Sequence, residues 1–475
     1  MSKKKIKSFS NFIFIFFLAF IFYRGRLGSD DLQAFDVAYN FVNNNVNFAN
    51  NTIQDQWQWS HRSIWIIQDI IIIYFLKILN FFLNFDLMYF SKYFCGWIIS
   101  LYSIFSIYLC FIYFKKKSIE SNVSLVICFG IFFGSSLSSY LTGSYIESLV
   151  IFLILLRFNI NNQYYKLIID CLITLIKSYY FLIILPLIIL EKNYLKNKIY
   201  YFLSLLFLFG FFKIFTFVES VNFVQTLPFN FNLKFIITNI IDMIFSPGFG
   251  VIFTSTIPFL LILVGFQRST LVKLFFILLF IIFISTIPFW HGQAPGGRYL
   301  ISTLIIFLPE FVRAIIILKK NKFLPKFLTV VILLTIFHLP ALEFRNTNMV
   351  NFENSVVSKK IVTEPASDRD LNSFPYHDLL FQNAIFANLI LYHKIFDNNK
   401  TIFFENRSFQ IRDVYPMTGL QRLIFIKKNK YEYFTKIELN YLSKYILLLE
   451  LFYYFLLIIF LFFFVRAFFK IGLFK

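Results

Sequence analysis

Residues 93–117 of the chain read YFCGWIISLYSIFSIYLCFIYFKKK, an apolar run from Tyr93 to Phe114 that ends in three lysines. A run of about 20 apolar residues is long enough for a helix to cross the hydrocarbon core of a bilayer. Lysines and arginines beside such spans collect on the cytoplasmic side of the membrane. The stretch therefore predicts a membrane-spanning helix whose carboxyl end, Lys115 to Lys117, lies in the cytoplasm.

The composition extends this interpretation to the whole chain. Of its 475 residues, 58% are hydrophobic and 15% are charged, which is not the composition of a soluble protein. Lys and Arg outnumber Asp and Glu by 45 to 25, and we attribute the excess to cytoplasmic loops rather than to nucleic-acid binding. The four cysteines all lie in apolar runs without the spacing of a metal site or a disulfide framework. We expect a polytopic integral membrane protein.

The other spans are oriented by the positions of the basic residues. A first helix, Phe12–Tyr23, follows Lys3 to Lys5, so the amino terminus is predicted to be cytoplasmic. Basic loops at Arg157–Lys166, Arg268–Lys273 and Lys319–Lys320 are assigned to the same side. Further apolar runs cover about Val123–Tyr140, Ser144–Leu156, Ile199–Phe217, Phe249–Phe266, Leu274–Phe289, Tyr299–Leu318, Phe327–Leu339 and Leu447–Val465. The prediction is an all-α protein of the bacterial inner membrane with about 12 transmembrane helices and both termini in the cytoplasm.

Two apolar segments allow alternatives. Only one crossing fits between the first helix and Lys115, so Ile64–Leu83 is predicted to be an interfacial helix within the first outer loop, residues 24–92. Leu167–Leu190 is either one helix with Lys177 at its centre or a hairpin of two short helices with Lys177 at the outer turn. Treating the first segment as a span and the second as a single helix leaves the downstream orientation unchanged.

An acidic pair, Asp30 and Asp31, stands just beyond the first helix on the predicted outer side. Two adjacent carboxylates repel each other and gain nothing from neighbouring lipid. One of them would serve as a general base or as the ligand of a divalent cation, poised by the other. The alternative is an amino-terminal cap for a helix that begins near Leu32, which explains one aspartate but not both. We favour the catalytic hypothesis.

Other polar residues are predicted to lie on the same face. Arg62 pairs with the carboxylates or binds a lipid phosphate, and Lys177 either snorkels or contacts a phosphate. Glu147 begins a span and either faces a polar cavity or is an exposed carboxylate at a helix end. The loop Trp290–Tyr299, WHGQAPGGRY, brings backbone N–H groups and the guanidinium of Arg298 to an anion. Substrate binding is assigned to His61, Glu147, Trp290, His291 and Tyr299.

The tract from Glu343 to Lys444 is too polar for the membrane and predicts a small outer domain of mixed structure, residues 342–445. Residues 446–475 then form the final span and a cytoplasmic tail. His377 and Asp378 lie in the polar tract without a nucleophile motif, so they do not indicate a catalytic triad.

Together these patterns resemble the GT-C superfamily of polytopic glycosyltransferases over residues 1–341. The resemblance rests on the acidic pair in the first outer loop, the hairpin broken at Lys177-Ser178, Phe-Ser-Pro-Gly-x-Gly from Phe245, and Trp-x-Gly-x(5)-Arg-Tyr-Leu from Trp290. It implies a hexosyl- or pentosyltransferase that uses a polyprenyl-phosphate sugar and acts on an acceptor glycan, lipid or protein. Asp30 or Asp31 would activate the acceptor, and Arg298 would match the arginine of a late Gly-Pro-Arg motif in which Gly297 replaces the proline.

Two rival functions stay open. A polysaccharide polymerase or ligase carries its signature in a large late loop, and the tract from Glu343 to Lys444 is such a loop. A flippase or transporter of lipid-linked saccharides would have charged residues inside several spans and broken helices related by an internal repeat. The sequence has no visible repeat of this kind.

Overall fold

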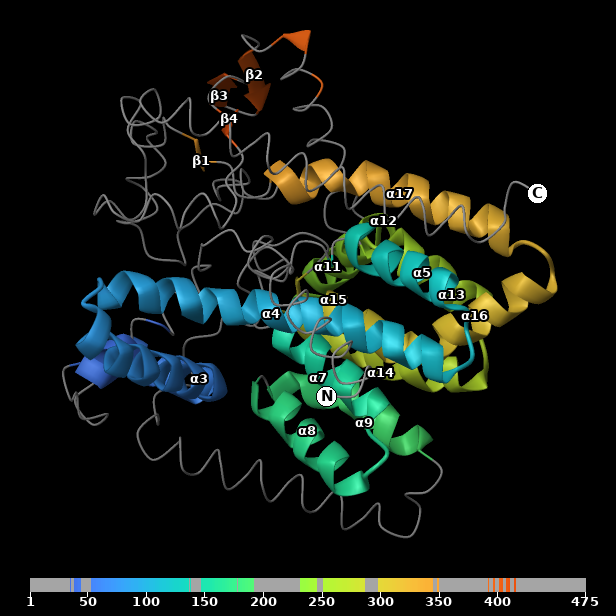
Figure 1. Ribbon diagram of the computed structural model, residues 1–475. Coiled ribbons are helices and arrows are strands. Elements are labelled where there is room, and N and C mark those ends of the chain that lie inside the picture. The colour runs from blue at the N-terminus through green and yellow to red at the C-terminus, as the bar shows by residue number, and fades with distance from the viewer. Residues whose placement is uncertain are drawn as a thin grey trace, which may run out of the picture.

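The computed structural model describes residues 35, 38–43, 53–135, 137, 147–176, 178–191, 231–245, 251–286, 298–344, 348–349, 392, 396–397, 401–404, 407–410 and 414–415. This part of the chain is mostly helical (Figure 1). Its α-helices are α3 Ile53–Leu83, α4 Leu87–Lys116, α5 Ser121–Phe133, α7 Glu147–Asn159, α8 Gln163–Ile176, α9 Phe181–Leu190, α11 Leu233–Phe245, α12 Val251–Thr254, α13 Thr256–Val264, α14 Arg268–Ser285, α15 Arg298–Leu304, α16 Leu308–Lys320 and α17 Leu324–Phe344. Two short 3₁₀ turns are η2 Ser178–Tyr180 and η5 Ile305–Phe307.

Four stretches of these helices are long and apolar enough to cross a membrane: Ile66–Leu83, Phe90–Lys116, Arg268–Ser285 and Leu300–Lys320. The expectation of a helical membrane protein is therefore confirmed. The predicted spans Phe12–Tyr23, Ile199–Phe217 and Leu447–Val465 lie outside the described residues. Within the tract predicted to be an outer domain, the described residues include two antiparallel pairs of short strands. They are β1 Asn348–Met349 with β4 Val414–Tyr415, and β2 Thr401–Phe404 with β3 Arg407–Gln410.

Helix α4 lies at the centre of the described bundle and packs against α3, α5 and α7 (Figure 1). The rings of Tyr102 and Phe152 are 5.4 Å apart, and those of Tyr113 and Phe158 are 5.6 Å apart. Both pairs advance in the same direction along the two helices, so α4 and α7 run parallel. This agrees with the charge pattern, which predicts that both helices lead toward the same side of the membrane.

The carboxyl ends of α4, α7 and α16 meet the start of α5. Lys116 Nζ donates to the Asn159 carbonyl oxygen at 2.9 Å, and Lys319 Nζ lies 2.6 Å from Glu120 Oε1. We call this the basic end of the bundle, defined by these four residues. The two lysine clusters assigned to the cytoplasm therefore share one end of the protein.

The segment Leu167–Leu190 is a hairpin, and the single-helix alternative is wrong. Its helices α8 and α9 pack against each other (Figure 1). An ion pair between Lys166 and Glu191 joins the ends of these helices that are farther from the turn. The chain turns back at η2, next to Lys177. Arms of 14 and 10 residues rise about 21 and 15 Å, which is short of the roughly 30 Å hydrocarbon core.

Helices α5 and α17 approach closely at two glycines one helical turn apart. A Cβ atom added to Gly130 would lie 2.2 Å from Val331 Cγ1, and one on Gly134 would lie 2.9 Å from Thr335 Oγ1. Small residues with this spacing allow helix backbones to approach in membranes. The pair fixes α17 against the bundle.

Two predicted spans are interrupted rather than continuous. The run Phe249–Phe266 forms α12 and α13 with a break at Ser255, and Tyr299–Leu318 forms α15, η5 and α16. Pro258 and Pro309 lie in the first turns of α13 and α16. Proline lacks a backbone N–H and is favoured in the first turn of a helix, so both prolines suit the helix starts at which they lie, although Pro186 is accommodated inside α9.

Other helix boundaries also differ from the prediction. The predicted interfacial segment belongs to the longer helix α3, whose apolar part meets the length and hydropathy of a span. The predicted loop Arg157–Lys166 shrinks to Ile160–Asn162, and α14 begins at Arg268 rather than Leu274. Helix α11 was not predicted at all. Arg157 and Lys273 are buried because each has a carboxylate partner, so neither belongs to a solvated loop.

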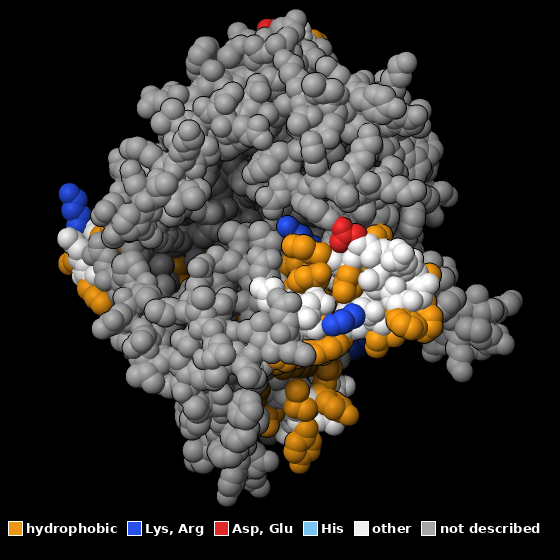
Figure 2. Space-filling view, turned by 90° about the vertical axis from the view of Figure 1, so that its left-hand side faces the viewer, with side chains coloured by type: hydrophobic (Ala, Val, Ile, Leu, Met, Phe, Trp, Pro, Cys, Tyr) orange, Lys and Arg blue, Asp and Glu red, His pale blue; other side chains and the backbone are white. Residues whose placement is uncertain are grey.

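Hydrophobic side chains are exposed on the side of the molecule that carries α3 and the start of α4 (Figure 2). On α3 the most exposed of them are Ile71, Phe75, Ile78, Phe81, Phe82 and Leu83. Buried residues such as Ile66, Ile73 and Leu76 occupy the other side of this helix. An exposed apolar face of this size is expected where a helix contacts lipid.

Candidate functional site

The candidate site lies at the end of the bundle opposite the basic end. Counting back from the contact between Phe152 and Tyr102, the parallel packing of α7 on α4 sets Glu147 level with Trp97. Helix α7 rises about 18 Å from Glu147 to Asn159, and the carbonyl oxygen of Asn159 accepts from Lys116 at the basic end. Glu147 is therefore about 18 Å from the basic end, which is short of the roughly 30 Å hydrocarbon core.

Glu147 is fully buried and meets the turn of the hairpin. The hydroxyl of Tyr180 donates a hydrogen bond to Glu147 Oε1 at 3.4 Å, and Tyr180 is buried as well. The ring of Tyr180 stacks on Phe280 at 6.2 Å, and Tyr179 packs 6.1 Å from Phe283. Of the two alternatives for Glu147, the exposed carboxylate at a helix end is wrong, because its side chain is buried. A buried carboxylate needs a polar partner, and Tyr180 supplies one.

Two more elements meet at this end. Helix α15, which begins at Arg298, packs against α7 (Figure 1). The amide of Asn239 on α11 donates to the carbonyl oxygen of Ser285, the last residue of α14, at 2.8 Å. The structure thus brings together Glu147, the turn beside Lys177 and the helix that Arg298 begins, three positions that the sequence assigned to one face.

The remaining predicted site residues are covered only in part. Asp30, Asp31, Lys177, Trp290 and His291 lie outside the described residues, as do the side chains of Arg298 and Tyr299. His61 and Arg62 fall within the backbone of α3, whose start at Ile53 corrects the prediction of a loop ahead of Ile64. Their side chains are also outside the described set.

A polar pair in α3, Gln68 and Asp69, was not assigned to the site from the sequence. The hydroxyl of Tyr102 donates to Gln68 Oε1 at 2.7 Å. Asp69 is 1% exposed, and its carboxylate lies beside the Gln68 amide and the Cys95 thiol. The signal was available, because an acidic residue inside an apolar helix is rare and usually functional.

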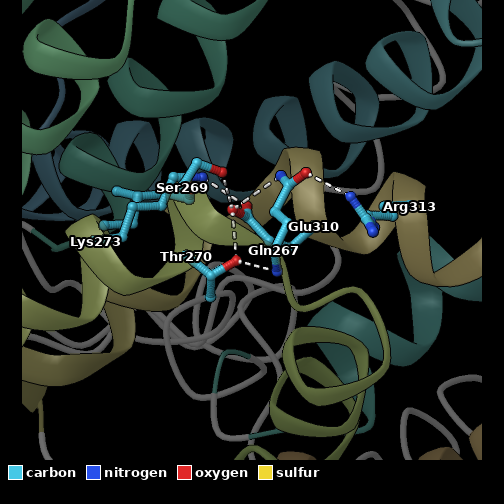
Figure 3. A network of polar contacts seen from close by, with 7 residues as sticks. Gln267, Ser269, Thr270, Lys273, Glu310 and Arg313 are labelled. Atoms are coloured by element: carbon cyan, nitrogen blue, oxygen red, sulfur yellow. Dashed lines mark hydrogen bonds and ion pairs between the residues drawn. The ribbon is translucent and has the colours of Figure 1, made fainter.

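A second buried carboxylate, Glu310, forms a network nearer the basic end (Figure 3). Its Oε2 atom lies 2.6 Å from Lys273 Nζ, which also donates to the Ile306 carbonyl oxygen at 2.9 Å. Its Oε1 atom accepts from Thr270 at 3.2 Å, and from Ser269 and Gln267 at 3.4 Å each. The lysine therefore neutralises the carboxylate and also satisfies a carbonyl oxygen at the break between α15 and α16.

The third polar cluster joins α7 to both ends of the hairpin. Arg157 Nε lies 2.7 Å from Asp170 Oδ1, and Arg157 Nη2 lies 3.1 Å from Glu191 Oε2. Lys166 completes the cluster through Glu191. Its two cations and two carboxylates balance, so the cluster serves as a structural clamp.

Within the described ranges, no three His, Cys, Asp or Glu side chains come close enough to hold a metal ion. Comparisons with protein-family models, curated proteins and solved structures find no match to this chain. The argument for function therefore rests on the residues and their arrangement.

Proposed function

We propose that the protein is a membrane glycosyltransferase that moves a sugar from a polyprenyl-phosphate donor to an acceptor hydroxyl or amine on the extracytoplasmic face. The observation that carries the proposal is the meeting of Glu147, the hairpin turn and the start of α15 at the end of α7 opposite the basic end. A polar site among apolar helices suits a substrate that joins a polar phosphate to a lipid tail.

The chemistry requires two kinds of group. The phosphate of the donor is already a competent leaving group, so the protein must take a proton from the acceptor and stabilise the departing phosphate charge. Asp30 or Asp31 is the proposed base. Arg298, Lys177 and Arg62 are the proposed phosphate contacts, because guanidinium and ammonium groups bind phosphate oxygens well.

The membrane arrangement is part of the proposal. It comprises about 12 crossings with both termini in the cytoplasm, in the inner membrane of a bacterium, with residues 342–445 as an outer domain and 446–475 as the last span and tail. Single-cysteine labelling at Ser118, beside the lysine cluster that ends α4, tests the orientation. Reagents that do not cross the membrane are expected to leave this position unlabelled in intact cells.

The decisive experiment is a transfer assay with a short-chain polyprenyl-phosphate sugar on Asp30→Asn and Asp31→Asn variants. Loss of the catalytic base is expected to lower turnover by roughly 10²- to 10⁴-fold in one of the two variants. Asp86→Asn is the matched control, since Asp86 is an exposed carboxylate in the connection between α3 and α4. Undiminished turnover in both test variants would rule out the assignment.

A transporter of lipid-linked saccharides is the second candidate. The observations that favour it are the helix breaks at Ser255 and at Ile305–Phe307 and the buried pair of Lys273 and Glu310. Transporters use interrupted helices and intramembrane charges to bind their substrates. In proteoliposomes, a transporter would move a labelled polyprenyl-phosphate sugar between leaflets without transferring the sugar, whereas the glycosyltransferase requires an acceptor and releases the lipid phosphate.

A further inference from the structure

Two helix connections at the basic end of the bundle are rich in lysine. One runs from the last turn of α4 to the start of α5, and the other runs from the last turn of α16 into the first turn of α17. Together they carry seven lysines and one acidic residue, Glu120. These lysines, all exposed, form what we call the lysine patch: Lys115, Lys116, Lys117, Lys319, Lys320, Lys322 and Lys326.

The two connections lie side by side. Lys319 Nζ lies 2.6 Å from Glu120 Oε1, and this ion pair ties the second connection to the first. Helices α5 and α17 also run parallel, because their contacts at Gly130 and Gly134 advance in the same direction along both helices. Counting back along both helices sets Leu324, the first residue of α17, level with the first turn of α5. The lysine patch is therefore one surface with a large excess of positive charge.

Lys322 holds a backbone conformation that is costly for a residue with a side chain. Its φ angle is 59°, in the left-handed region where glycine is the usual residue after a helix end. The N–H group of the next residue, Phe323, donates to the Leu318 carbonyl oxygen at 2.9 Å and closes α16. Ser118, with a φ angle of 60°, follows α4 in the same way. Glycine would serve this cap better than lysine, so the benefit of Lys322 must come from its ammonium group.

An exposed apolar stripe begins at the lysine patch. Lys326 lies in the first turn of α17, and its ammonium lies 5.7 Å from the centre of the exposed Phe323 ring. Exposed apolar side chains follow Lys326 along the same face of α17, three or four residues apart: Val330, Leu333 and Phe337. The positive surface and the apolar stripe are therefore continuous.

We infer that the lysine patch binds the head groups of anionic phospholipids, whose acyl chains lie along the exposed stripe of α17. Ammonium groups bind phosphate oxygens well, and clusters of lysines beside membrane helices attract anionic lipids. An acidic soluble protein would match the charge of the patch but not the adjoining apolar stripe. The inference does not depend on the proposed function, and a lipid bound here would hold the α4–α5 and α16–α17 connections together.

The test measures the preference of the full-length protein for an anionic lipid. Protein in neutral detergent micelles is titrated with phosphatidylglycerol and, separately, with phosphatidylcholine, and native mass spectrometry gives the two dissociation constants. The wild type is expected to bind phosphatidylglycerol roughly tenfold or more tightly than phosphatidylcholine. Lys322→Gly and Lys326→Gln are each expected to reduce this preference roughly fivefold, the contribution of one lysine near an anionic surface.

Two control variants separate charge from backbone strain. Ser118→Gly relieves the same strain at the same end of the bundle without removing a charge, and Lys234→Gln removes an exposed lysine of α11, outside the patch. Both should leave the preference unchanged. Lys322→Gly and Ser118→Gly should both raise the Tm in neutral micelles, so weaker lipid binding by Lys322→Gly would not reflect poor folding. Equal binding of the two lipids by the wild type, or an equal loss of preference in the test and control variants, overturns the inference.

Discussion

Glu310 and Asp69 are both carboxylates buried among apolar helices, and their surroundings differ completely. Glu310 is 0% exposed and receives hydrogen bonds on both oxygens, including one from Lys273, which is 3% exposed. Asp69 is 1% exposed, and its Oδ1 atom receives none from the described residues. Burial of a carboxylate is costly unless it is paired. The comparison predicts that the first carboxylate, which has a cation beside it, contributes more to folding than the second, whose neighbours are the Gln68 amide and the Cys95 thiol.

The largest expected effect comes from unpairing Glu310. Lys273→Met leaves a buried carboxylate without its cation and is expected to lower the free energy of unfolding by about 3–5 kcal/mol. The double variant Lys273→Met/Glu310→Leu should recover most of that loss, because an apolar pair of similar volume replaces the ion pair. Reversible unfolding in mixed detergent micelles measures both variants. Equal stability of the single and double variants would contradict the pairing argument.

The next largest effect is expected at Gly265, where the turn before α14 lies close to α16. A Cβ atom on Gly265 would lie 2.0 Å from the carbonyl oxygen of Glu310 and 3.1 Å from the backbone nitrogen of Ala314. Gly265→Ala must therefore push the two elements apart, which strains the network around Glu310 and is expected to cost about 1–3 kcal/mol. The same unfolding measurement applies. Combining Gly265→Ala with Lys273→Met should give less than the sum of the two losses, since both changes disturb one network.

Replacing Asp69 is expected to change the free energy of unfolding in the opposite direction. Asp69→Leu removes an unsatisfied buried group and is expected to leave stability unchanged or to raise it by about 1 kcal/mol. Glu310→Leu is the matched comparison, because it makes the same kind of change where the carboxylate is fully bonded and leaves Lys273 buried alone. A loss of stability in Asp69→Leu as large as that in Glu310→Leu would show that the Gln68 amide and the Cys95 thiol stabilise Asp69 as strongly as Lys273 stabilises Glu310.

Much of the helical frame could be predicted because it depends on local signals. The apolar run that ends in Lys115 to Lys117 predicted α4, and the lysine clusters predicted which helix ends share the basic end. The breaks at Ser255 and Ile305 were not predicted, although Pro258 and Pro309 are residues that favour the first turn of a helix. No contact was predicted from Gly130 and Gly134, although their spacing is typical of helices that approach closely in membranes; both the contact and its partner α17 follow from the structure.

The candidate site was less predictable, because burial depends on partners that are distant in the sequence. Arg157 and Lys273 looked like loop cations, and only their contacts with Asp170 and Glu310 show that they are buried. Glu147 looked equally suited to a helix end or a cavity until Tyr180, 33 residues away, was found to donate to it. The distribution of charges along the chain predicts on which side of the membrane a loop lies, but it does not predict which distant residue a charged side chain contacts.

The smallest effect tests whether pairing matters where water is present. Lys319 and Glu120 form an ion pair at 2.6 Å, but their side chains are 64% and 60% exposed. Water already solvates both charges, so Lys319→Ala is expected to change the free energy of unfolding by less than about 1 kcal/mol, and this difference should vanish in high salt. Lys273→Met should remain destabilising in the same salt, since the buried pair is screened far less. Equal salt sensitivity of the two variants would mean that water reaches Glu310, and the contrast with Asp69 would then no longer rest on burial.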